Sequence, residues 1–137
     1  MLLSYAILFG SLASEQGFGW KSAQKSSLKK CPIGAALLAV GQESDEQPSL
    51  NALKEWPWLA NHYNAPVLLP LYVRPTAMTI IWQLNDIQKW TRTRIAAWVA
   101  AIEPLDQLTD ADCAVLNEQA DEEQQWQQIN QEDVESA

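Results

Sequence analysis

Apolar residues recur with the spacing of an α-helix in the second half of the chain. Positions three or four apart are occupied by Ile80, Leu84, Ile87, Thr91, Ile95, Trp98 and Ile102. At about 3.6 residues per turn, this spacing places them on one face of a helix. The pattern predicts one long amphipathic helix over about residues 76–102, with Thr76 as its N-cap and Pro104 beyond its end.

Three shorter segments have apolar patterns of their own. Residues 2–13 form an apolar run that is too short for periodicity to distinguish a helix from a buried strand. Pro32 and Gly41 bracket the apolar residues 33–40, which predicts a short buried helix. Apolar spacing from residue 50 to residue 63 fits a helix that is interrupted at Pro57.

These segments predict a mainly α fold. A chain of 137 residues with 47% hydrophobic content can bury one core, so we expect a single helical domain over residues 1–120, built around the long helix. The alternative is an α+β fold in which residues 2–9 and 67–73 pair in a small sheet, because prolines bracket the second segment and favour extended structure.

Charge divides the chain into two parts. All nine Lys and Arg residues lie at or before Arg94, whereas residues 103–137 contain eleven carboxylates and no Lys, Arg or His. Beyond Ala120 the chain is mostly Gln, Glu and Asp, which bury too little apolar surface to form a core. We therefore expect residues 121–137 to form an acidic tail, either disordered or a frayed helix.

A segment this acidic attracts basic surfaces. We expect it to bind a basic protein partner through Asp112, Glu118, Asp121, Glu122, Glu123 and Trp126. The segregation of charge thus favours a non-enzymatic protein-interaction module of the adaptor, inhibitor or assembly-chaperone type.

The basic part of the chain provides an alternative function. Aromatic and cationic residues are interleaved there, as in surfaces that bind single-stranded nucleic acid. The candidate basic patch comprises Trp20, Lys21, Lys25, Lys29, Lys30, Arg92 and Arg94. A nucleic-acid-binding subunit modulated by the acidic tail is less favoured, because a net charge of −8 opposes binding to polyanions.

Phosphate-binding motifs do not fit the glycine pair at positions 17 and 19. Ser22 stands where the dinucleotide-binding pattern requires a third glycine, and Trp20 stands where the Walker loop requires glycine before lysine. We interpret this stretch as a flexible turn with a buried aromatic residue. It therefore predicts no nucleotide cofactor.

Metal and catalytic signatures are equally weak. His62 is the only histidine, and Cys31 and Cys113 lie 82 positions apart without neighbouring metal ligands. We expect no catalytic residues, no metal site and no cofactor, so the sequence does not predict an enzyme. Two separated free thiols suit a reducing compartment.

The start of the chain and the tryptophan content bear on location and partners. The apolar run at residues 2–13 has no basic leader and is too short to span a bilayer, so we expect a cytoplasmic protein with no membrane span. Seven Trp residues are many for this length, and Trp82 and Trp126 do not fit the expected core. Indoles are enriched at interfaces, which adds a homo-oligomer to the partners considered.

Overall fold

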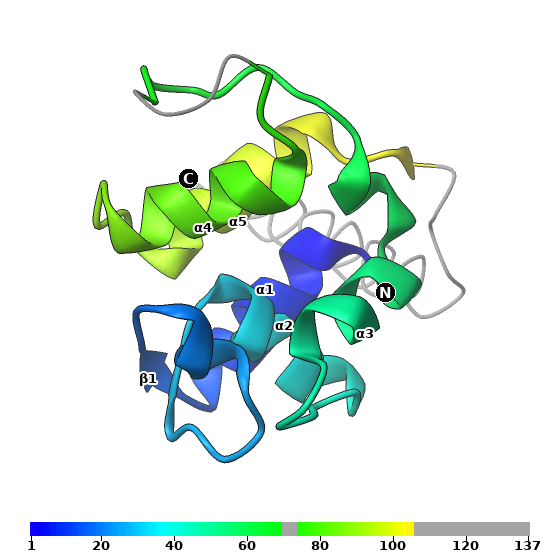
Figure 1. Cartoon of the computed structure of the whole chain (residues 1–137), viewed down its shortest axis with the longest axis vertical. Helices are drawn as coiled ribbons and strands as arrows, with labels where there is room; N and C mark the ends of the chain where they lie inside the picture. Colours follow the sequence, from blue (N-terminus) through cyan, green and yellow to red (C-terminus); the bar gives the residue numbers. More distant parts are fainter. Residues whose placement is uncertain (70–73, 106–137) are drawn as a thin grey trace, which may run out of the picture. The chain divides into compact units, whose positions relative to one another are not determined.

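The structure is a computed structural model that describes residues 1–69 and 74–105. Within the compact unit Leu2–Pro104, the elements are α1 (Leu3–Leu12), β1 (Glu15–Gln16), the 3₁₀-helix η1 (Trp20–Ala23), β2 (Lys29–Lys30), α2 (Pro32–Val40), α3 (Pro48–Glu55), the 3₁₀-helix η2 (Pro57–Ala60), α4 (Ala77–Asp86) and α5 (Arg92–Ile102). The described fold is mainly α, as predicted (Figure 1). Strands β1 and β2 form a two-residue parallel pair. None of the helices described here has the length and apolar content needed to cross a membrane.

Helix α1 lies in the core and packs against α2 and α5 (Figure 1). Its buried residues Leu3, Ala6, Ile7 and Gly10 recur three or four positions apart and so share one face. A Cβ atom at Gly10 would overlap the carbonyl oxygen of Ala35 in α2, so glycine permits the close approach of the two backbones. Because residues 3–12 are helical, this segment is not the strand that the α+β alternative required.

The prediction of one continuous helix over residues 76–102 is not confirmed. Helix α4 ends at Asp86, α5 begins at Arg92, and Lys89 between them has a φ of 56°, which breaks the helical geometry. The Thr91 hydroxyl accepts a hydrogen bond from the Arg94 N–H at 3.2 Å and so caps α5. Thr91 therefore fits both the apolar stripe and a helix start, and spacing alone could not distinguish these two roles.

Several predicted helix boundaries agree with the structure, whereas the helix expected over residues 50–63 instead begins at Pro48 and its second part ends at Ala60. Pro32 is the first residue of α2, and Gly41 ends it with a φ of 70°. The Thr76 hydroxyl accepts a hydrogen bond from the Thr79 N–H at 3.3 Å at the start of α4. Helix α3 ends before Pro57, which begins η2. These helix ends can be predicted from the sequence because caps depend on residues that are close together in the chain.

Helix α5 contacts both ends of α1. The Glu103 carboxylate, directly after α5, accepts hydrogen bonds from the backbone N–H of Ser4 at 3.1 Å and from the Ser4 hydroxyl. At the other end, the Arg92 guanidinium donates to the carbonyl oxygen of Ser14, just beyond α1. An anion thus lies at the N-terminus of α1 and a cation at its C-terminus, which is the favourable arrangement for the helix dipole.

Candidate interaction site

A cleft of about 420 Å³ opens beside η1 and α4. Its walls come from η1 and the residue before it, from the starts of α2 and α3 with the residues just before them, and from one side of α4. The lining residues are Gly19, Trp20, Ala23, Cys31, Pro32, Ile33, Glu46, Gln47, Pro48, Ser49, Met78, Thr79, Ile81, Trp82 and Asn85. The lining is largely apolar, and the volume is in the range of ligand-binding sites. We call it the tryptophan cleft.

Both indoles of the cleft are exposed for local structural reasons. In α4, Ile80 and Leu84 face the core, so Trp82 projects from the other side and is 43% exposed. Trp20 follows Gly19, whose φ of 82° favours glycine, and is 67% exposed. Phe18 is 47% exposed, so the expectation of a buried aromatic residue in this turn is wrong.

Hydrogen bonds hold the turn at residues 17–19 against the end of α4. The Gln16 side-chain amide donates to Asn85 Oδ1 at 2.8 Å, and Asn85 Nδ2 donates to the carbonyl oxygen of Gly17 at 2.9 Å. The Gly19 N–H donates to Asp86 Oδ1 at 2.9 Å. Asn85 is fully buried, so water does not compete for its hydrogen bonds. The turn that leads to Trp20 is therefore fixed against the helix that carries Trp82.

Cys31 lies in the wall of the cleft, at the N-cap of α2. Its Sγ accepts a hydrogen bond from the Gly34 N–H at 3.3 Å. Burial raises the pKa of the thiol, and this effect outweighs the lowering by hydrogen bonds with Ser22 and Gly34. Cys31 is therefore held as a neutral thiol at neutral pH, and not as the thiolate that a nucleophile requires.

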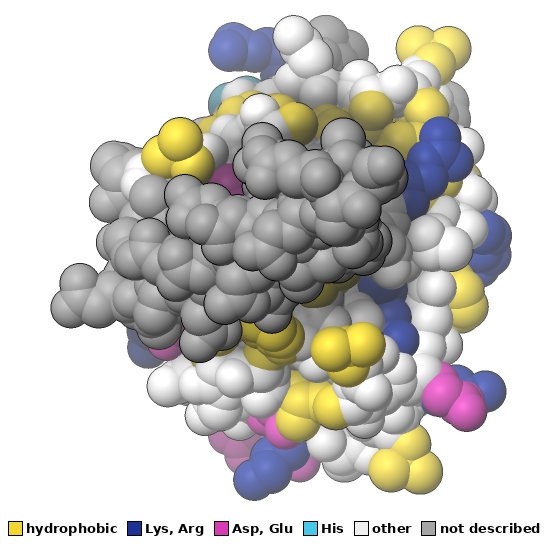
Figure 2. All heavy atoms as spheres, turned by 180° about the vertical axis from the view of Figure 1, so that it is seen from behind, with side chains coloured by type: hydrophobic (Ala, Val, Ile, Leu, Met, Phe, Trp, Pro, Cys, Tyr) yellow, Lys and Arg dark blue, Asp and Glu magenta, His cyan; other side chains and the backbone are white. Residues whose placement is uncertain are grey.

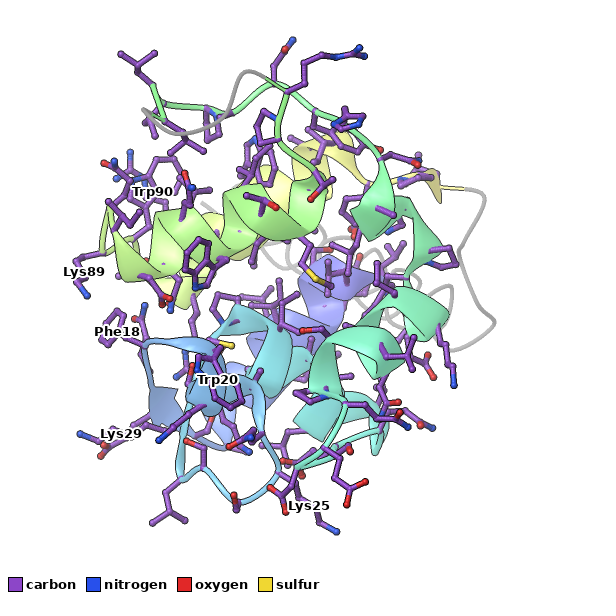
Figure 3. The ribbon with its side chains drawn as sticks, in the orientation of Figure 1. Phe18, Trp20, Lys25, Lys29, Lys89 and Trp90 are labelled. Carbon is purple, nitrogen blue, oxygen red and sulfur yellow. The ribbon has the colours of Figure 1, made fainter. Side chains whose placement is uncertain are left out.

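Two cation–π pairs form a second surface. Lys89 Nζ lies 4.1 Å from the centroid of the Phe18 ring, and Arg94 Cζ lies 3.7 Å from that of Trp90. We call Phe18, Lys89, Trp90 and Arg94 the basic–aromatic strip. Figure 3 shows Trp90, Lys89 and Phe18 following one another down the left side of the view. In the reverse view of Figure 2, dark blue Lys and Arg side chains gather along the corresponding right-hand side.

The candidate basic patch divides into an exposed and a buried group. Exposed members are Trp20, Lys21, Lys25, Lys29 and Arg94. Lys30 and Arg92 are only 4% and 8% exposed. Lys30 Nζ donates to the Glu43 carboxylate at 2.8 Å and to the Gln24 carbonyl oxygen at 2.8 Å. Lys30 and Arg92 therefore hold the fold together and do not belong to an exposed basic patch, which corrects the sequence-based assignment.

The acidic residues expected to bind a partner lie outside the described residues. These are Asp112, Glu118, Asp121, Glu122, Glu123 and Trp126. The expected boundary between a domain over 1–120 and a tail over 121–137 also lies there. The role of this segment therefore stays a prediction.

The sequence did not single out several residues of these two surfaces, namely Ile33, Met78, Ile81 and Trp90. One signal was available, because Met78 and Trp82 are four positions apart and so share the outer side of α4. The pairing of Phe18 with Lys89 had no such signal, because it joins positions far apart in the chain.

These features define a small, mainly α domain with an apolar cleft and a separate basic–aromatic strip. Within residues 1–69 and 74–105, no three His, Cys, Asp or Glu side chains are placed to hold a metal ion together. No protein-family model, curated protein or solved structure matches this chain.

Proposed function

We propose that this protein is a non-enzymatic protein-interaction module whose tryptophan cleft receives a bulky apolar side chain of a basic partner. The observation that carries the proposal is the exposure of Trp20 and Trp82 around one apolar cleft. Large apolar side chains gathered at a concavity are typical of binding sites. Indoles are also enriched among the residues that dominate binding energy, because they bury a large area when a partner docks.

Charge favours a basic partner. Glu46 is the one residue of the cleft lining with a formal charge, and its side chain is exposed. A Lys or Arg next to the apolar anchor would be attracted to this carboxylate and would stack on an indole face. The acidic residues in 103–137 attract the same kind of partner over a longer range.

Rigidity of the cleft supports binding as well. The hydrogen bonds of Asn85 and Asp86 hold the turn before Trp20 in place without a ligand. Side chains that are already positioned lose less conformational entropy when a partner binds. The cleft is thus suited to a short peptide segment, for which this entropy is a large fraction of the binding free energy.

A selection from a random peptide library tests the proposal. With the full-length protein as bait, we expect enrichment of peptides that carry a large apolar residue beside Lys or Arg. The affinity of a synthetic enriched peptide, measured by fluorescence anisotropy, should fall at least about tenfold in Trp82→Ala. The matched control is Phe9→Ala, which removes a ring of similar exposure, 40%, on α1 and outside the cleft.

Two results would contradict the proposal. One is a library selection without enrichment of apolar and basic residues together. The other is an enriched peptide that binds Trp82→Ala as tightly as the wild-type protein.

The contribution of the acidic segment is tested separately by deleting residues 121–137. The deletion should weaken capture of a basic partner while the melting temperature stays nearly constant. Unchanged capture would remove the acidic segment from the proposal.

A further inference from the structure

We propose that the basic–aromatic strip binds single-stranded nucleic acid, an activity that goes beyond the protein-interaction function proposed above. The strip consists of two cation–π pairs, Lys89 over the Phe18 ring and Arg94 over the Trp90 ring. Surfaces that bind single strands combine these two kinds of group, because rings stack on bases while cations neutralise phosphates.

The strip is held together by its supporting hydrogen bonds. The Gln16 side-chain amide donates to the carbonyl oxygen of Trp90 at 2.8 Å and also to Asn85. The nearby Asp86 carboxylate is engaged by the N–H of Gly19 and the side chain of Asn85. The turn that carries Phe18 and the backbone of Trp90 are therefore held by the same two side-chain amides, those of Gln16 and Asn85, and Asp86 is occupied with structural hydrogen bonds.

Neighbouring residues extend the surface. Lys21, three positions after Phe18 in the chain, is exposed. In Figure 3, Lys29 lies beyond Phe18 on the same side of the view. A single strand lying along this side would meet two stacking partners, Phe18 and Trp90, and a cation next to each.

Single-stranded nucleic acid fits this surface better than other polyanions. A duplex hides the faces of its bases and would leave the rings unused. An acidic polypeptide would pair with Lys89 and Arg94 but has no aromatic bases to stack on Phe18 and Trp90. The combination of rings and cations is what selects the ligand.

The charge of the described residues permits such binding. They contain nine Lys and Arg and seven Asp and Glu, a net charge of +2, whereas the remaining residues carry ten carboxylates and bring the whole chain to −8. The acidic segment lowers the affinity of the whole chain for a polyanion by repulsion. Binding should therefore be measurable at low salt and should weaken steeply as salt is raised.

The test is a titration of a fluorescein-labelled single-stranded oligonucleotide of about 12 nucleotides with the full-length protein, followed by anisotropy from about 20 to about 200 mM salt. We expect Phe18→Ala to weaken binding about fivefold or more. Lys89→Gln and Arg94→Gln should each reduce the slope of log affinity against log salt by about 0.7. Circular dichroism of each variant establishes that the fold is retained.

Two control variants separate this proposal from the proposed function. Lys54→Gln removes an exposed lysine of α3 outside the strip and should leave oligonucleotide binding unchanged. Trp82→Ala should likewise leave it unchanged while it weakens peptide binding in the cleft, and Lys89→Gln should show the reverse. A wild-type protein that binds the oligonucleotide but no library peptide would thus count against the cleft and not against the strip.

Three outcomes overturn the assignment. Absence of binding by the full-length protein at the lowest salt does so directly. Equal affinity of wild-type protein and Phe18→Ala excludes stacking at the strip. Displacement of the oligonucleotide by polyglutamate at equal charge concentration identifies a site for acidic polypeptides instead.

Discussion

Arg92 donates from Nη2 to the carbonyl oxygen of Ser14 at 2.5 Å and from Nη1 to the Ser14 hydroxyl at 2.8 Å. Nη1 also donates to the carbonyl oxygen of Lys30 at 3.3 Å. The first residue of α5 thereby joins the end of α1 to strand β2. Burial lowers the pKa of Arg92 from its ordinary value, and the guanidinium remains a cation at physiological pH. Arg92 serves as a structural cation, although the sequence places it among the residues of a basic patch.

The first prediction compares Arg92 with its neighbour Arg94. Arg92→Ala should lower the free energy of unfolding by about 2–3 kcal/mol, because it leaves buried acceptors at the end of α1 without their charged donor. Arg94→Ala should cost about 1 kcal/mol or less, since it removes only an exposed cation–π contact. Urea denaturation of both variants measures the difference. Equal losses would show that the hydrogen bonds of Arg92 do not contribute as described.

The second prediction uses the adjacent pair Lys29 and Lys30. Lys30→Met should destabilise the protein by about 2 kcal/mol, because the Glu43 carboxylate and the Gln24 carbonyl oxygen lose a buried partner. Lys29→Met should change stability by about 0.5 kcal/mol or less, because Lys29 is exposed and its ion pair with Glu15 is long, with 4.0 Å between Lys29 Nζ and Glu15 Oε2. Thermal unfolding of both variants gives the comparison, and a larger effect at Lys29 would contradict the structure.

These two pairs show which properties could be predicted from the sequence. Residues 29 and 30 are both lysines, and their burial differs because strand β2 places one side chain outward and the other toward Glu43. That distinction depends on contacts with residues 24 and 43, which no local pattern reports. The mainly α class and the caps at Pro32, Gly41 and Thr76 were predictable because they rest on neighbouring residues.

The candidate site was predictable only in part. Trp82 stood out because it lies opposite the apolar stripe, and the structure places it in the cleft wall. The cleft itself brings together η1, α2, α3 and α4, so it depends on the tertiary arrangement. The break at residues 87–91 was not predictable, because α4 and α5 each continue the same apolar spacing across it.

The third prediction concerns the contact between α1 and α2. Replacing a glycine inside a helix by alanine ordinarily stabilises the helix by about 1 kcal/mol. Gly10→Ala should instead lower the free energy of unfolding by about 3 kcal/mol, because its Cβ would overlap the Ala35 backbone and force the helices apart. Urea denaturation measures the change.

Gly41→Ala is the matched control for Gly10→Ala. A Cβ at Gly41 would meet open space, so Gly41→Ala should lower the free energy of unfolding by only about 1 kcal/mol. This loss comes from placing alanine at a φ of 70°, which residues with a Cβ atom disfavour. A Gly10→Ala protein as stable as the wild type would mean that the two backbones are not in close contact.

The fourth prediction concerns how the reactivity of the Cys31 thiol depends on pH. It is measured in the Cys113→Ser variant, so that Cys31 is the one thiol that can react. Because burial raises the pKa of Cys31, alkylation by N-ethylmaleimide should be slower in the folded than in the unfolded protein at the same pH. The rate should rise only above the range of an ordinary cysteine, about pH 8.5.

The same pKa shift makes stability depend on pH. The folded state holds the Cys31 proton more tightly than the unfolded state, so its contribution is fully present below the unfolded pKa and is lost as pH rises through the folded pKa. Cys31→Ser in the same background should lack this loss of stability.

Because Cys31 lines the cleft, a bound peptide should slow its alkylation further. A folded rate equal to the unfolded rate would show that the thiol is not buried, and an unchanged rate with peptide bound would place the peptide elsewhere.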